Sequence, residues 1–143
     1  MARKIALILL FLLYLGAGIN HFWHPQGYYT IIPPYFSNPF LINALAGIAE
    51  ITCALLLLFP TTRKWGSYGI ILMLIAFIPA HVYMIEKGGC MGKEICIPVW
   101  AAWLRLFPLQ LFLMVWAWWA ARDADESSNA SSYTPEYPQP SNY

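Results

Sequence analysis

The chain has 143 residues, of which 59% are hydrophobic, 17% aromatic and only 10% charged, and its formal net charge is +1. This composition is too apolar for a soluble domain of the same size and predicts one small integral membrane domain. The near-neutral charge, with basic residues spread along the chain, excludes a nucleic-acid-binding surface. We therefore expect partners in the lipid bilayer or among small molecules.

The first apolar segment begins with Arg3 and Lys4 and continues to about Trp23. A basic start before about fifteen apolar residues also describes a secretory signal peptide. Aromatic residues extend this run, however, to nearly the roughly 20 residues that a membrane-spanning helix needs. We predict a spanning helix that ends at Asn20 and His21.

The connection over residues 25–39 combines prolines and a glycine with several tyrosines and isoleucines, Tyr28 among them. The prolines and the glycine exclude a regular spanning helix, whereas the tyrosines and isoleucines are too apolar for a fully solvated loop. We predict an interfacial Pro/Tyr-rich loop that folds over the mouth of a helix bundle. Its role is either that of an aromatic anchor or that of a functional lid.

The second apolar segment, residues 40–60, carries one carboxylate, Glu50, near its middle. A carboxylate inside a bilayer is costly unless it is neutral, paired or facing a protein-lined cavity. Asn43 precedes it by two turns of the same predicted helix. We therefore expect a buried polar site around Glu50.

The third apolar segment, residues 65–85, contains Pro79 two positions before His81. A proline inside a helix frees the carbonyl one turn earlier and kinks the helix. We predict a kink here, with His81 as a candidate site residue beside it.

A polar loop over residues 86–98 follows and carries Cys90 and Cys96. A disulfide persists on the outer side of a membrane, and this spacing is compatible with a small closed ring. We expect a structural disulfide. A redox-active pair is the alternative, although the chain has no Cys-x-x-Cys motif.

The fourth apolar segment, residues 99–120, contains Arg105 and has tryptophans at both ends, as membrane interfaces favour. From Arg122 the composition changes to acidic residues, serine, proline and tyrosine. We expect a four-span domain over residues 1–121 and a disordered cytoplasmic tail over residues 122–143.

Basic residues predict the orientation of these spans. Those that fall on one side of a four-span layout are Arg3, Lys4, Arg63, Lys64 and Arg122. The lysines of the 86–98 loop are offset by glutamates, so the positive-inside rule places both termini in the cytoplasm. The expected fold is all-α, a four-helix transmembrane bundle in the cytoplasmic (inner) membrane of a bacterium.

Depth along each helix predicts how the polar residues meet. At about 1.5 Å per residue from the outer ends, Glu50 lies roughly 15 Å deep and Arg105 roughly 10 Å. His81 and Asn43 lie roughly 5 Å deep. We expect a Glu50–Arg105 ion pair with the other polar groups above it, around an outward-facing pocket; a purely structural ion pair is the alternative. The candidate ligand-binding residues are Glu50, Arg105, His81, Asn43, Asn20, His21 and Tyr28.

Other chemistries find little support. His21 and His24 lie three residues apart, but Pro25 follows at once and no third ligand has suitable spacing, so no metal site is expected. The chain has no haem attachment motif, phosphate loop or nucleophile elbow. The sequence assigns no catalytic residue.

Four stretches of the chain, in order, resemble the DoxX-like family of small four-helix membrane proteins. They are residues 18–22 leading into Tyr28 and Pro33-Pro34, residues 46–50, residues 79–84 and residues 104–110. The resemblance covers nearly all of residues 5–120. Relatives usually have asparagine at the position of His81. Here Phe107 is also an extra residue before Pro108, so Arg105 and Gln110 share a helix face only if a wide turn absorbs the insertion.

The resemblance implies a link to quinone reduction and thiol redox maturation, or to escort and assembly of other proteins. Three functions follow as expectations. The first is a redox accessory protein that binds a quinone or similar apolar ring and has a membrane or periplasmic oxidoreductase as partner. The second is a small-solute or proton-coupled carrier in which Glu50 titrates. The third is a non-catalytic assembly protein for membrane partners, and a homo-oligomer is also among the expected assemblies.

Overall fold

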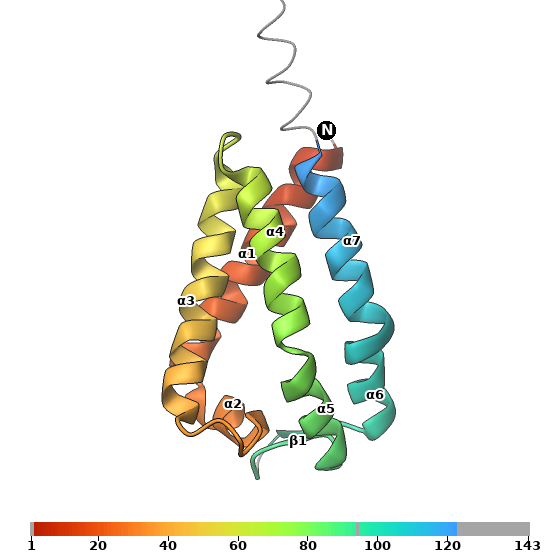
Figure 1. Ribbon diagram of the computed structural model, residues 1–143. Coiled ribbons are helices and arrows are strands. Elements are labelled where there is room, and N and C mark those ends of the chain that lie inside the picture. The colour runs from red at the N-terminus through yellow and green to blue at the C-terminus, as the bar shows by residue number, and fades with distance from the viewer. Residues whose placement is uncertain (1, 94, 123–143) are drawn as a thin grey trace, which may run out of the picture.

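The computed structural model describes residues 2–93 and 95–122, and most of these residues are helical (Figure 1). The expected tail lies, from residue 123 on, outside the described residues. In chain order the elements are α1 (Ala2–Trp23), α2 (Pro25–Ile31), α3 (Pro39–Leu58), α4 (Arg63–Ala76), α5 (Ile78–Glu86), β1 (Cys90–Met91), β2 (Ile95–Cys96), α6 (Val99–Leu104), η1 (Arg105–Leu109) and α7 (Gln110–Ala121).

Among the described residues, four helical segments are long and apolar enough to cross a membrane. They are Ala2–Trp23, Pro39–Leu58, Arg63–Glu86 and Val99–Ala120. Each has 20 to 24 residues, which matches the hydrocarbon thickness of a bilayer. The prediction of a helical membrane protein with four spans is confirmed.

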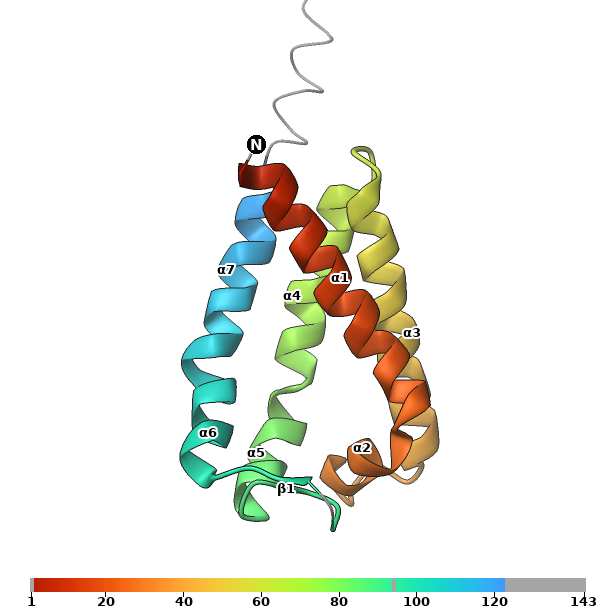
Figure 2. The ribbon, with the colours of Figure 1, turned by 180° about the vertical axis from the view of Figure 1, so that it is seen from behind.

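The four spans approach one another at one end of the molecule and spread apart at the other (Figures 1 and 2). The first turn of α1 lies beside the last turns of α7 at the narrow end, where the Arg3 guanidinium sits 5.3 Å from the centre of the Trp119 ring. From there α1 crosses the bundle obliquely and runs along α3. Both described chain ends therefore lie on the same side of the bundle.

The wide end is covered by α2 and by the hairpin of β1 and β2 (Figures 1 and 2). Pro25 stands at the first position of α2, where its missing N–H costs no hydrogen bond. In the hairpin, Cys90 lies opposite Cys96, and a disulfide joins them. The connection between the first two spans contains a short helix, α2, that was not predicted.

Two of the spans are broken, and the breaks are neighbours. The third span is interrupted at Phe77, two residues before Pro79, as predicted. In the fourth span a wide turn was left open by the sequence, and it is present: Phe107 is extended, with φ −148° and ψ 119°, inside the wide turn η1. The wide turn absorbs the extra residue, so Gln110 points into the bundle and is only 3% exposed.

Packing is tightest between α1 and α3. A Cβ atom at Gly18 would lie 2.9 Å from the carbonyl oxygen of Gly47, and one at Gly47 would lie 2.8 Å from Cβ of His21. Only glycine permits so close an approach of two helices. Gly16, by contrast, has no neighbour within 4 Å of such an atom.

The described core residues form two separate clusters. The larger, which fills the narrow half, consists of Leu10, Tyr14, Cys53, Ala54, Leu57, Ile70, Met73, Leu74, Ala117 and Ala120. The smaller, beneath α2 and the hairpin, consists of Ile31, Met84 and Ala102. The gap in packing between the two clusters is where the candidate site lies.

Candidate functional site

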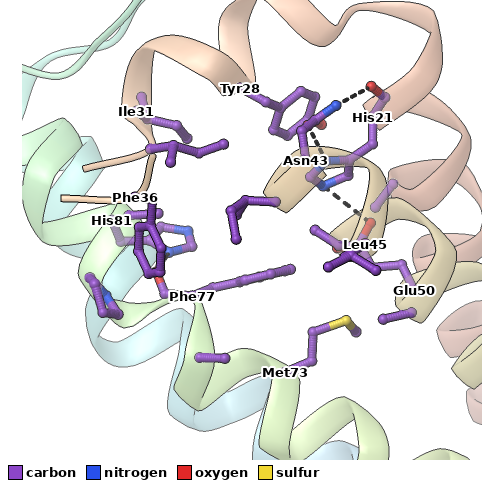
Figure 3. Close-up of a pocket in the computed structure, with 18 of the residues that line it drawn as sticks. His21, Tyr28, Ile31, Phe36, Asn43, Leu45, Glu50, Met73, Phe77 and His81 are labelled. Atoms are coloured by element: carbon purple, nitrogen blue, oxygen red, sulfur yellow. Dashed lines mark hydrogen bonds and ion pairs between the residues drawn. The ribbon is translucent and has the colours of Figure 1, made fainter. Parts of the chain in front are cut away.

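A cavity of about 590 Å³ separates the two clusters, and Figure 3 shows the side chains around it. Its size is within the range of about 300–1,000 Å³ that small-molecule sites occupy. Its lining includes Cys53 and Met73 of the larger cluster and Ile31 of the smaller one. The wall is mainly apolar and carries a few polar groups, which is the usual character of a ligand pocket.

His21 and Asn43 form the best-defined polar contact of the cavity. Asn43 Nδ2 donates to the main-chain carbonyl of His21 at 2.8 Å, so Asn43 Oδ1 is the atom that faces His21 Nδ1, at 2.7 Å. Because an amide oxygen only accepts, Nδ1 carries a hydrogen and donates it. The close packing of α1 on α3 is what brings these two side chains together.

The other ring nitrogen of His21 faces Glu50. His21 Nε2 lies 3.5 Å from Glu50 Oε2, and Glu50 is 5% exposed. That separation is too long for a good hydrogen bond, and Oε2 has no hydrogen-bond partner among the described residues. Since Nδ1 already holds its hydrogen, a favourable Nε2–Oε2 contact requires one further proton, on the imidazole or on the carboxyl group. One added proton would therefore let His21 and Glu50 form a hydrogen-bonded pair.

The expected Glu50–Arg105 ion pair is wrong for the described structure, which pairs Glu50 with His21 instead. Arg105 lines the same cavity from η1, but no ion pair joins it to Glu50. The prediction compared depths along the helices and ignored their lateral spacing. The fourth span diverges from α3 toward the wide end, whereas glycine contacts hold α1 against α3 (Figure 1).

Tyr28 covers the polar end of the cavity. Its ring stacks on His21 with centroids 3.8 Å apart, and its hydroxyl accepts a hydrogen bond of 2.7 Å from Asn20 Nδ2. Asn20 Oδ1 in turn lies 3.0 Å from His24 Nδ1. Asn20 is exposed and lies outside the cavity wall, so it positions Tyr28 and is not itself placed to touch a ligand.

His81 lies across the cavity from His21 and Glu50 (Figure 3). Its Nδ1 lies 2.8 Å from the carbonyl oxygen of Phe77 and must donate to it, because a carbonyl only accepts. This contact fixes the ring at the break in the third span. The Nε2 atom has no partner among the described residues and is available to a ligand.

The apolar wall includes residues that the sequence did not single out, above all Phe77, Phe36 and Met73. Phe77 is the residue at which the third span breaks, and its ring lies 6.4 Å from that of His21. The predicted proline kink was the one signal that could have found it. Gln110 does not line the cavity; its amide donates to the Leu74 carbonyl instead.

Within residues 2–93 and 95–122 no group of three or more His, Cys, Asp or Glu side chains is arranged to hold a metal ion. The cavity carries the His21–Glu50 pair on one wall and the acceptor nitrogen of His81 on the opposite wall.

Residues 10–121 match the family described as a domain of unknown function (DUF8561). The chain belongs to this family. The match includes most of the first membrane-crossing segment, the other three segments and every polar residue of the cavity, so the site is part of the family's domain. Neither the curated proteins nor the solved structures yield a match.

Proposed function

We propose that the protein binds a quinone or a similar apolar ring in this cavity and serves as a membrane redox accessory protein. The proposal rests on how polar and apolar groups are distributed over the cavity wall. Hydrogen-bonding groups stand on opposite sides of the cavity. On one side the Glu50–His21 pair can donate a proton to a ring oxygen, and on the other His81 Nε2 accepts from the hydroxyl of the reduced ring. The apolar remainder of the wall suits the ring faces.

Reduction of a quinone to a quinol consumes two electrons and two protons. A proton held between His21 and Glu50 would reach one ring oxygen, and a second proton, taken up from water onto His81 Nε2, would reach the other. The described residues hold no redox centre beyond the Cys90–Cys96 disulfide. The electrons therefore come from a partner, a membrane or periplasmic oxidoreductase, and the resemblance to DoxX-like proteins supports this role.

The proposal includes an orientation and a location. The narrow end carries Arg3, Lys4, the Arg63–Lys64 turn and Arg122, so the positive-inside rule places it in the cytoplasm. The wide end with α2 and the hairpin then faces the periplasm of a bacterium.

The test is retention of a quinone by the protein in lipid nanodiscs, detected by native mass spectrometry and by equilibrium binding of decylubiquinone. We expect the wild-type protein to bind one ring and Glu50→Leu to bind it about two- to tenfold more weakly, because the ring oxygen loses a hydrogen bond worth about 0.5–1.5 kcal/mol. The matched control is Glu86→Leu, which alters an exposed carboxylate outside the cavity. If the wild-type protein binds no quinone, the proposal is wrong.

A proton-coupled carrier is the second candidate, favoured by the proton that His21 and Glu50 can take up between them. It predicts proton uptake into proteoliposomes that depends on a solute gradient and is lost in Glu50→Gln. A redox accessory protein gives no such uptake.

A further inference from the structure

The cavity wall divides into a buried inner part and an exposed rim. His21, Asn43 and Glu50 are between 3% and 6% exposed. Leu45 on α3 and Leu72 on α4 also line the cavity, yet they are 54% and 69% exposed. Both leucines belong to membrane-spanning segments. The cavity therefore opens sideways between the second and third spans, at a surface that faces lipid.

The wide end of the cavity is closed, in contrast to this lateral opening. Ile31 and Pro33 line it there and are buried, and Tyr28 stacks on His21. The hairpin lies outside them and packs near α2. A Cβ atom added to Gly27 of α2 would lie 3.8 Å from Met91 of the hairpin. The Lys87 ammonium also donates to the carbonyl of Thr30 at 2.9 Å, which ties α2 to the end of α5. A water-soluble molecule has no comparable route through this cover.

The innermost group, Glu50 Oε2, is buried and lacks a hydrogen-bond partner among the described residues. A buried carboxyl oxygen without a partner is costly, and in its protonated form it donates to a ring oxygen, so a ligand that accepts this hydrogen bond gains more than the hydrogen bond alone. The polar head of the ligand thus belongs at the inner end, and whatever follows the head must leave through the rim.

We infer that the ligand enters from the bilayer between α3 and α4, and that it is a lipid-soluble molecule with one hydrogen-bonding head and a hydrocarbon tail. The head binds at Glu50 and His21, and the tail passes between Leu45 and Leu72 into the lipid. The inference rests on the proposed function for the identity of the head as a quinone-type ring. It excludes a small water-soluble solute as the natural ligand.

The experiment compares decylubiquinone with the same ring without its decyl tail, by equilibrium binding to protein in phosphatidylcholine nanodiscs. The rim variants are Leu45→Trp and Leu72→Trp, singly and together. The matched controls are Leu55→Trp on α3 and Ile75→Trp on α4, which change exposed residues outside the cavity wall.

We expect the double rim variant to raise the Kd for the tailed ring about tenfold or more, because displacing two methylene groups is sufficient for that change. Its Kd for the tail-less ring and both Kd values of the controls should equal those of the wild type. Rim variants that bind the tailed ring as the wild type does overturn the inference and leave the proposed function standing.

The two proposals can fail separately. If the wild type binds neither ring but retains a single-tailed membrane lipid that the double rim variant loses, the lateral route holds and the quinone function fails. If the wild type retains no lipid-soluble ligand of any kind in native mass spectrometry, both are wrong.

Discussion

Gln110 donates its side-chain amide to the main-chain carbonyl of Leu74 and so joins the two broken membrane spans at their breaks. The Leu74 carbonyl lies in the last turn of α4, where the chain turns away at Phe77 and the regular helical hydrogen bonds end. Gln110 is the first residue of α7, directly after the wide turn. One side chain therefore stabilises an irregular backbone in a part of the molecule from which water is largely excluded.

Replacing Gln110 with methionine should lower the free energy of unfolding by about 1–3 kcal/mol, because a buried carbonyl loses its side-chain partner. Thermal unfolding in mild detergent, followed by circular dichroism, measures this loss. Gln26→Met is the matched control, since Gln26 is exposed on α2 and should tolerate the change. Equal effects of both substitutions would count against a structural role for the Gln110–Leu74 contact.

The pairing of Glu50 with His21 predicts a specific pattern of energetic coupling. In a double-mutant cycle, Glu50→Gln and His21→Gln should be non-additive by about 1 kcal/mol or more, as expected for residues in direct contact. The cycle of Glu50→Gln with Arg105→Met should be additive within about 0.5 kcal/mol, because no ion pair joins those residues. Both cycles are measured by unfolding in the same detergent. A stronger coupling to Arg105 would restore the pairing expected from depth alone.

Gly18→Ala should destabilise the protein by about 1–3 kcal/mol, because the added methyl group overlaps the Gly47 carbonyl and helices α1 and α3 must separate. Gly16→Ala, two residues away on the same helix, is the control. It has no neighbour to meet and should be neutral or slightly stabilising, since alanine favours helix over glycine. Comparable losses at both positions would mean that the contact with α3 is not the cause.

The proposed orientation is tested by labelling intact cells with an impermeant maleimide. In a background without native cysteines, Ser37→Cys at the wide end should react and Thr61→Cys at the narrow end should not. Both positions are exposed in the structure, so a difference in labelling reports the side of the membrane. Labelling of position 61 alone would invert the orientation.

Replacing both Cys90 and Cys96 with serine should cost about 1–3 kcal/mol, because a ring of this size restricts the unfolded chain only modestly. We expect the double variant to insert into the membrane and to bind decylubiquinone as the wild type does. Native-state trypsin cleavage after Lys93, in the hairpin, should become faster. Normal protein levels with complete loss of a redox phenotype would instead assign the disulfide a catalytic role.

The sequence predicted the spans and the break at Phe77 because both depend on local signals, namely runs of apolar residues and the position of Pro79. It also drew attention to His21, Asn43 and Glu50, since polar groups stand out in apolar segments. Their pairing was only partly predictable. It depends on the lateral distance between helices, which the spacing of residues along one helix does not contain.

The residues of the apolar cavity wall could not be predicted from the sequence, for a related reason. Phe36 and Met73 have no signal that separates a cavity-lining residue from one that faces lipid, since both environments are apolar. From the sequence, the break in the fourth span was only one of two possibilities. The insertion of Phe107 is visible in the sequence, but whether a wide turn absorbs it depends on a partner for Gln110, and that partner is a main-chain carbonyl.

The glycine contact between α1 and α3 also divides the molecule mechanically. These two helices carry the wall with His21 and Glu50, and backbone atoms in contact leave them no room to slide or rotate against each other. The opposite wall, with His81 and Arg105, lies at or beyond the breaks of its spans. We therefore expect a change in cavity size to involve α5 and α6 rather than the wall formed by α1 and α3.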